Sequence, residues 1–258
     1  MTRLPFALAA SVMALALTLS VAASPVAAQT VPMNDEERRA FGAQVRAYLM
    51  EHPEVIFEAV AEYERRTAEA QSGMDATLVE INAEEIFDDG HSWVGGNLDG
   101  DLTLVEFMDY RCSFCRRAQP QMLEFLNTDG NVRLVVKEFP ILGPQSDVMS
   151  RFALSVQQEG TDEQYWAAHE SLMEWDGDFT ETSARLLASE LELDGDVILA
   201  GMNSTEVSDI LRANRELAQR LQISGTPTFV MGDAEGGELL RGYLPADEML
   251  NIAAQLRG

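Results

Sequence analysis

Cysteine is nearly absent from this sequence, whose 258 residues contain only Cys112 and Cys115. Two cysteines form at most one disulfide within a chain, which excludes a scaffold held by several disulfides. No second cysteine pair is present to complete a zinc site of four ligands, and the three histidines, His52, His91 and His169, belong to different predicted elements. The sequence therefore predicts no structural metal site.

Basic residues are also scarce, because 18 Lys and Arg face 43 Asp and Glu, giving a formal net charge of -25. Lys137 is the only lysine. A surface of this charge repels phosphate backbones and anionic lipids, so we expect no nucleic-acid binding and no binding to membrane surfaces. The simplest interpretation of the acidity is a soluble, exported product.

A long hydrophobic run occurs only near the N-terminus, between Leu4 and about Ala23. The basic residue before it and the small residues after it predict a secretory signal peptide over residues 1–28, cleaved after Ala28. A membrane anchor is the alternative, since the run is nearly long enough to span a bilayer, but the Ser24-Pro25 break favours removal. We expect the remaining chain to be periplasmic.

Helical spacing of apolar residues predicts an N-terminal helical arm over residues 29–89. Asn34 is a predicted N-cap with three acidic residues after it, and Pro53 opens a second helix that reaches about Gln71. Each helix has an apolar face, which needs a partner. That partner is either the rest of the same chain or a second copy, which would make the arm a homo-oligomerisation stalk.

A strand, a helix and a strand follow in close succession. Residues Leu102–Met108 form a nearly continuous apolar run, typical of a strand buried on both faces. It leads directly into Cys112, where a helix to about Asn127 begins, and Val132–Lys137 is the next predicted strand. This order predicts a right-handed βαβ unit.

The rest of the chain completes an α/β domain over residues 90–258. Between about 144 and 221 the pattern is helical throughout, which predicts an inserted helical subdomain. Strands resume at Thr228–Met231 and Glu238–Arg241, and a closing helix runs from Pro245 to about Leu256.

The spacing of Cys112 and Cys115 at the start of a helix places both sulfurs on one face, close enough to bridge. Cys112 lies at the positive end of the helix dipole, which favours its thiolate and makes it the nucleophile. Cys115 is more shielded and would resolve a mixed disulfide. The cysteines themselves carry the electrons, so no cofactor is expected. Two thiolates also suit Cu(I), and a copper-handling protein is the alternative.

These motifs together resemble the thioredoxin superfamily. Val105-Glu106-Phe107 leads to Cys112-Ser113-Phe114-Cys115, and Gly225-Thr226-Pro227-Thr228-Phe229 lies near the C-terminus. The helical insertion between the two motifs is similar to the DsbA-like branch, so the resemblance implies a thioredoxin fold with an inserted helical subdomain and an N-terminal helical arm. It also implies a cis Pro227 that faces the cysteines, with Thr226, Ser113 and Phe114 shaping the substrate groove.

Glu106 interrupts an apolar strand six residues before Cys112. The resemblance implies a buried acid at this position that assists proton transfer during disulfide exchange. Lys137 ends the neighbouring strand and is a candidate partner for its carboxylate. The alternative is a solvated Glu106–Lys137 pair at a strand edge, because carboxylates are rarely buried.

The dipeptide Ser113-Phe114 departs from the strongly oxidising relatives, which have His where Phe114 stands. Phe donates no hydrogen bond to sulfur, so a less acidic Cys112 is expected. Oxidase, reductase and oligomeric disulfide isomerase all stay open, and Thr226 resembles the isomerase-like members. Expected partners are unfolded or partly folded exported proteins and a membrane redox partner. A scaffold protein with a vestigial cysteine pair is a further alternative.

Overall fold

The computed structural model describes residues 33–258, so the predicted signal peptide lies outside the described residues. The chain divides into two compact units, which meet in the sequence between Ala59 and Val60. None of the helices within residues 33–258 is long and apolar enough to cross a membrane.

Helix α1 (Asp35–Glu51) belongs to the first unit, and helix α2 (Glu54–Ile81) begins there. The Asn34 side chain accepts hydrogen bonds from the backbone N–H groups of Glu36 and Glu37, and the Glu37 side chain accepts one from the Asn34 N–H. This capping box confirms the predicted N-cap. No residue of α1 is buried.

Helix α2 ends ten residues beyond the predicted end near Gln71. Gly73 disfavours a helix there, but tertiary contacts within the second unit outweigh this local preference. Val79 is fully buried, and the Asp75 carboxylate accepts hydrogen bonds from both terminal nitrogens of Arg241. Both contacts depend on the folded second unit, so the helical pattern in the sequence does not predict them.

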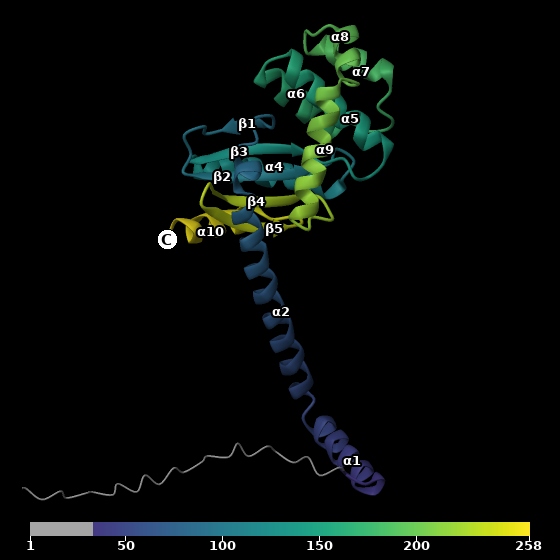
Figure 1. Ribbon diagram of the computed structural model, residues 1–258, viewed down its shortest axis with the longest axis vertical. Coiled ribbons are helices and arrows are strands. Elements are labelled where there is room, and N and C mark those ends of the chain that lie inside the picture. The colour runs from purple at the N-terminus through teal and green to yellow at the C-terminus, as the bar shows by residue number, and fades with distance from the viewer. Residues whose placement is uncertain (1–32) are drawn as a thin grey trace, which may run out of the picture. The chain divides into compact units, whose positions relative to one another are not determined.

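The second unit is built on a mixed five-stranded sheet with the strand order β1-β3-β2-β4-β5 (Figure 1). The strands are β1 (Trp93–Gly96), β2 (Leu102–Met108), β3 (Val132–Glu138), β4 (Thr228–Asp233) and β5 (Gly236–Arg241). Strands β2 and β3 run parallel, as the predicted βαβ unit requires, and the other neighbouring pairs are antiparallel.

Helices pack on both faces of this sheet. Helix α4 (Ser113–Asp129) connects β2 to β3 and packs against α10 (Ala246–Arg257), whereas α3 (Ala83–Phe87) contacts β2 and β4. Alternation along β2 sends Leu104 and Met108 into the core beneath α4 and sends Val105 and Phe107 into a second core with α3. The two faces of β2 therefore meet different surroundings.

Between β3 and β4 the chain is entirely helical. These helices gather beyond one end of the sheet, and α9 extends back to contact β3 (Figure 1). They are α5 (Pro144–Glu159), α6 (Asp162–Glu174), α7 (Glu181–Glu190), α8 (Gly195–Gly201) and α9 (Thr205–Arg220).

Candidate functional site

The turn that carries Cys112 is held by Asp109, the residue that follows β2. The Asp109 carboxylate accepts hydrogen bonds from the backbone N–H groups of Arg111 at 2.8 Å, Ile141 at 2.8 Å and Leu142 at 3.0 Å. Its carbonyl accepts the Cys112 N–H at 3.0 Å. The sequence pattern did not point to Asp109, because two of the partners of its side chain, Ile141 and Leu142, lie more than thirty residues away.

Cys112 is the N-cap of α4, and Cys115 lies in the first turn of that helix. The Cys112 sulfur accepts the Cys115 N–H at 3.4 Å. Both cysteines are free thiols, Cys112 being 5% exposed and Cys115 fully buried. A substrate sulfur can therefore reach Cys112 first.

The more exposed thiol, Cys112, is also the more acidic of the two. A hydrogen bond from the Cys115 side chain is the main cause that lowers the pKa of Cys112, from 9.0 to about 5, and it outweighs burial. The same hydrogen bond, together with burial, raises the pKa of Cys115 well above its usual range. At neutral pH this favours one thiolate, on Cys112, beside one thiol, and it does so although the Phe114 side chain has no hydrogen-bond donor, because the backbone of Phe114 contributes a hydrogen bond to the sulfur.

Thr226 and Pro227 lie against Cys112, although they are more than a hundred residues away in the sequence. The Thr226–Pro227 peptide bond is cis, as the resemblance implies. In its protonated form, the Cys112 thiol donates a hydrogen bond to the Thr226 carbonyl, with 3.1 Å between sulfur and oxygen. The Pro227 carbonyl accepts the Gly242 N–H at 2.9 Å, which fixes this loop to the segment after β5.

Ser113 and Phe114 lie at the solvent-facing start of α4, and Phe114 is 52% exposed. The Arg117 guanidinium lies 4.3 Å from the centre of the Phe114 ring, within the range of a cation–π contact. An aromatic ring and a cation therefore flank the more exposed cysteine.

Glu106 is buried on the face of β2 that points toward α4. Neither oxygen of its carboxylate has a hydrogen-bond partner among residues 33–258, and the residue is 1% exposed. Burial, followed by the negative charges of Cys112 and Glu138, raises the pKa of Glu106 from 4.5 to about 8. A carboxyl group of this kind can release and accept a proton near neutral pH.

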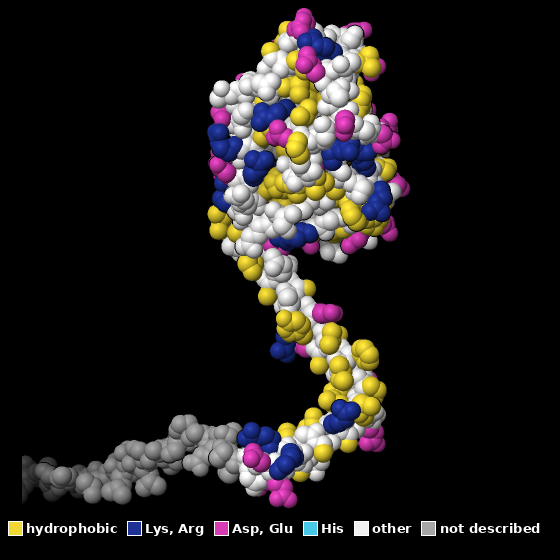
Figure 2. Space-filling view, turned by 90° about the vertical axis from the view of Figure 1, so that its right-hand side faces the viewer, with side chains coloured by type: hydrophobic (Ala, Val, Ile, Leu, Met, Phe, Trp, Pro, Cys, Tyr) yellow, Lys and Arg dark blue, Asp and Glu magenta, His cyan; other side chains and the backbone are white. Residues whose placement is uncertain are grey.

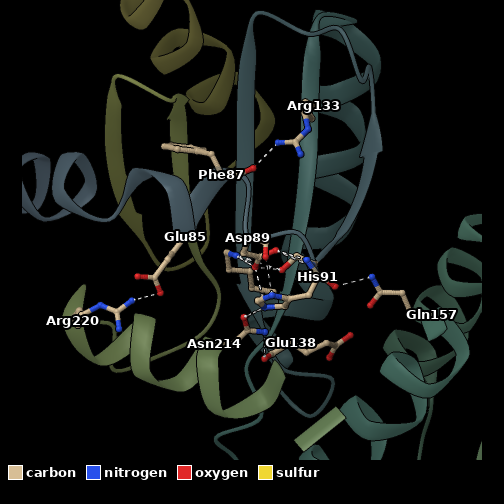
Figure 3. A network of polar contacts seen from close by, with 11 residues as sticks. Glu85, Phe87, Asp89, His91, Arg133, Glu138, Gln157, Asn214 and Arg220 are labelled. Carbon is tan, nitrogen blue, oxygen red and sulfur yellow. Dashed lines mark hydrogen bonds and ion pairs between the residues drawn. The ribbon is translucent and has the colours of Figure 1, made fainter. Parts of the chain in front are cut away.

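The predicted partnership of Glu106 with Lys137 is wrong. Glu106 is in register with Val136, so Lys137 points to the opposite face of the sheet, and it is also not a solvated residue. Its ammonium group forms a buried ion pair with Asp89, the residue labelled at the centre of the polar network in Figure 3, and lies 3.3 Å from the Ser92 hydroxyl. Burial opposes ionisation of Asp89, but the charge of Lys137 and its hydrogen bond lower the Asp89 pKa to about 2.

A second buried acid, Glu138, was also missed by sequence reasoning. Its Oε1 accepts the hydroxyl of Tyr110 at 2.7 Å and the hydroxyl of Tyr165 at 2.9 Å. The Tyr110 hydroxyl lies 3.1 Å from Nδ1 of His169. An acidic residue at the end of an apolar strand was the only available signal, since the tyrosines and the histidine come from distant segments.

Within the described part of the chain, no group of three or more His, Cys, Asp and Glu side chains is arranged to hold a metal ion. The two thiols of Cys112 and Cys115 are the softest donors that the site offers.

Two family profiles match the sequence. The profile described as "DSBA-like thioredoxin domain" matches residues 103–257, which include all but the first residue of β2, both cysteines and Pro227. This chain belongs to the DSBA-like thioredoxin domain family. A second profile, described as "Copper resistance protein ScsC N-terminal domain", matches residues 37–70.

Solved structures of similar proteins agree with this membership. A thioredoxin-like oxidoreductase from Silicibacter pomeroyi DSS-3 is 37% identical and superposes with a TM-score of 0.62, over 68% of this chain and 98% of that protein. BcfH from Salmonella enterica Typhimurium is 26% identical with a TM-score of 0.70, over 86% of this chain and 97% of that one.

Among curated proteins, the Na(+)/H(+) antiporter NhaA 1 of Salinispora arenicola is 25% identical over 166 residues. The match covers 64% of this chain but only 25% of the antiporter. The chain thus spans about a quarter of the length of this relative.

Proposed function

We propose that this protein is an exported thiol-disulfide oxidoreductase that exchanges disulfides with protein substrates through Cys112 and Cys115. The observation that carries the proposal is the unequal pair of thiols at the start of α4, beside the cis Thr226–Pro227 bond. Membership of the DSBA-like family and the likeness to a thioredoxin-like oxidoreductase support it.

In the reducing direction, the Cys112 thiolate attacks one sulfur of a substrate disulfide. The substrate disulfide breaks, a mixed disulfide forms with Cys112, and the second substrate sulfur leaves as a thiolate that takes up a proton. Cys115 then loses its proton and attacks the Cys112 sulfur, which releases the first substrate sulfur. Two electrons pass from the cysteine pair to the substrate, and the oxidising direction is the reverse.

Glu106 is the proposed proton carrier for the second step. Cys115 keeps its proton up to high pH, so its attack needs a base, and the Glu106 charge is among the causes that raise its pKa. The Glu106 carboxyl titrates in the right range and has no hydrogen-bond partner among the described residues. Its environment therefore suits proton transfer better than a structural role.

The proposed substrates are unfolded or partly folded exported proteins, bound beside Cys112. Phe114 offers an exposed apolar contact, and the backbone around Thr226 and Pro227 offers polar groups to an extended chain. A membrane redox partner would restore the cysteine pair after each turnover. The N-terminal hydrophobic run supports export and a periplasmic location.

Covalent trapping tests the proposal. With a peptide that contains one disulfide, we expect Cys112→Ser to abolish cleavage, whereas Cys115→Ser accumulates a mixed disulfide visible as a mass increase equal to one peptide chain. Thr182→Ala, on the exposed surface of α7, is the matched control and keeps the wild-type rate. Adduct formation by Cys112→Ser, or no cleavage by the wild type, would contradict the proposal.

The arm is proposed to assemble copies of the chain. Apolar side chains line α1 and α2 (Figure 2), and Phe41, Tyr48, Phe57 and Tyr63 are each more than half exposed. Such stripes need a partner, and a second copy offers an identical stripe. Sedimentation should show an oligomer that Phe57→Glu dissociates and the control Glu58→Gln does not. A wild-type monomer would contradict this assembly.

Copper handling is the second candidate function. It is favoured by the match of residues 37–70 to the profile of a copper resistance protein's N-terminal domain, together with the two soft thiols. Anaerobic titration of the reduced protein with Cu(I) tests it. Stoichiometric binding that disappears in Cys112→Ser is expected for a copper protein, and absence of binding removes this candidate.

A further inference from the structure

Glu138 ends β3 on the same face of the sheet as Glu106. Because β2 and β3 are parallel, Glu106 is in register with Val136 and Met108 with Glu138, so both acids point toward the active-site helix α4. In Figure 3 the Glu138 side chain extends away from Asp89 and His91, while its backbone carbonyl accepts the Asn214 amide at 3.1 Å.

The Glu138 carboxylate is buried with neutral hydroxyl donors and no cation. It accepts hydrogen bonds from Tyr110 and Tyr165, and no ion pair involves it within residues 33–258. All four members of the cluster, including His169, are at most 1% exposed. Burial lowers the pKa of His169 to about 3, so this imidazole is neutral and supplies no compensating charge.

The cluster is attached to the turn that carries the nucleophile. Tyr110 lies between Asp109, whose carbonyl holds the Cys112 N–H, and Arg111. Its own carbonyl accepts a hydrogen bond from the Arg116 side chain at 3.0 Å. The hydroxyl end of Tyr110 therefore contacts Glu138 while its backbone belongs to the active-site turn.

A purely structural role does not explain an uncompensated carboxylate at this position. Tyrosine hydroxyls are satisfied equally well by a neutral amide oxygen, and burying a charge without a counter-ion costs free energy. The ionisable groups that act on Glu138 are Asp109 and Glu106, from the end of β2 and from β2 itself, Tyr110, and Tyr165 from α6, and His169 of α6 contacts the Tyr110 hydroxyl. None of them is a cation at neutral pH.

Glu138 changes charge in the pH range where disulfide exchange takes place. Burial raises its pKa from 4.5 to about 7, against the lowering effect of the hydrogen bonds from its neighbours. Its negative charge is in turn one of the causes that raise the pKa of Glu106. The two acids thus influence each other's ionisation across the same face of the sheet.

We infer that Glu138, held by Tyr110 and Tyr165, is a positioning residue whose charge sets the pH range over which Glu106 exchanges a proton with Cys115. The inference rests on the proposed function, because it concerns the proton that the second thiol must lose. Among the described residues, the hydrogen bonds of this cluster do not reach either sulfur.

The sign of the effect follows from repulsion between two negative charges. Ionised Glu138 disfavours ionised Glu106, so Glu138→Gln should let Glu106 ionise at lower pH. Glutamine keeps an oxygen that accepts the tyrosine hydroxyls. Repulsion between two buried like charges on one face of a sheet is strong enough to move the midpoint of the rate-against-pH profile down by about 0.3 to 1 pH unit.

The test measures the resolving step, the release of a peptide from the mixed disulfide with Cys112, as a function of pH. Wild type, Glu138→Gln and Glu106→Gln are compared with Glu124→Gln, which removes one exposed charge from α4 and should leave the midpoint unchanged. A lower midpoint in Glu138→Gln alone supports the inference. An unchanged midpoint, or a shift equal to that of Glu124→Gln, overturns it.

Tyr165→Phe is the second variant, should Glu138→Gln fail to fold. It removes one hydrogen bond to the ionised carboxylate, so Glu138 stays protonated over more of the range and the midpoint should again move down, by less. If Glu106→Gln keeps the wild-type profile, the role of Glu106 fails and the inference fails with it. If wild type performs no exchange at all, the proposed function fails instead.

Discussion

Each face of the central sheet buries a charged or ionisable side chain, but only one of the two side chains has a partner. Lys137, on the face covered by α3 and α9, has a carboxylate partner in Asp89 and a hydroxyl neighbour in Ser92. Glu106, on the face covered by α4, is just as buried but has no hydrogen-bond partner among residues 33–258. The strands that carry them are adjacent and parallel.

This difference separates a charged side chain that is held in an ion pair from a carboxyl group that can exchange its proton. A buried ion pair satisfies both members and fixes their protonation states, and the Asp89 pKa is lowered to about 2 for this reason. An unpaired buried acid keeps its proton until the pH approaches 8 and is free to exchange it. The face with the unpaired acid is the face with the cysteines.

The largest expected effect comes from breaking the pair. Lys137→Met leaves the Asp89 carboxylate buried without its cation, so we expect the free energy of unfolding to fall by about 3–5 kcal/mol. Chemical denaturation measures this change. Lys137→Met combined with Asp89→Asn should recover part of the loss, because no uncompensated charge remains. A loss below about 1 kcal/mol in the single variant would mean that the pair contributes little.

Removing the unpaired acid Glu106 should stabilise the protein at high pH, whereas breaking the ion pair destabilises it. Glu106 has a folded-state pKa near 8, above its ordinary 4.5, so its contribution to stability is fully present below about pH 4.5 and is lost as the pH rises through about 8. In Glu106→Gln this pH-dependent loss should disappear. Unfolding of both proteins at about pH 5 and about pH 8 checks the sign, and equal pH dependence would contradict it.

The same variant should also slow the chemistry. We expect the resolving step of Glu106→Gln to be at least about 10-fold slower at neutral pH, since a general base typically contributes that much or more. Single-turnover release of a peptide from Cys112 provides the rate. Lys137→Met, if folded, should keep its pH midpoint, because its ammonium lies on the other face.

The smallest expected effect concerns the neighbour of the pair. The Ser92 hydroxyl donates to the Asp89 carboxylate at 2.7 Å. Ser92→Ala should therefore lower the free energy of unfolding by about 1 kcal/mol without changing the exchange rate. A decrease as large as that of Lys137→Met would show that the hydroxyl, rather than the ammonium, satisfies Asp89.

Local sequence patterns predicted much of the fold. The apolar run of β2, the cysteine pair and the strand after α4 specify the βαβ unit, and the long helical pattern after Pro144 locates α5 to α9. The end of α2 was placed too early, since its last turns depend on Val79 and on the contact between Asp75 and Arg241.

The features of the candidate site that depend on strand register were harder to predict from the sequence. Lys137 looked like a partner of Glu106 because the two strands are neighbours, but parallel pairing with Val136 places the side chains on opposite faces. The contacts of Asp109 and the cluster around Glu138 join segments that are distant in sequence, so no local pattern predicts them. The motifs around Cys112 and Pro227 could be recognised from their resemblance to the thioredoxin superfamily alone, without knowledge of the strand register.

The most direct test of the central claim is a titration of the thiolates in the reduced protein, followed by their ultraviolet absorbance. The account predicts that one thiolate, assigned to Cys112 by its absence in Cys112→Ser, forms with a midpoint near pH 5, while Cys115 stays protonated throughout the neutral range. Two thiols that both titrate near pH 9, the ordinary value, would contradict it.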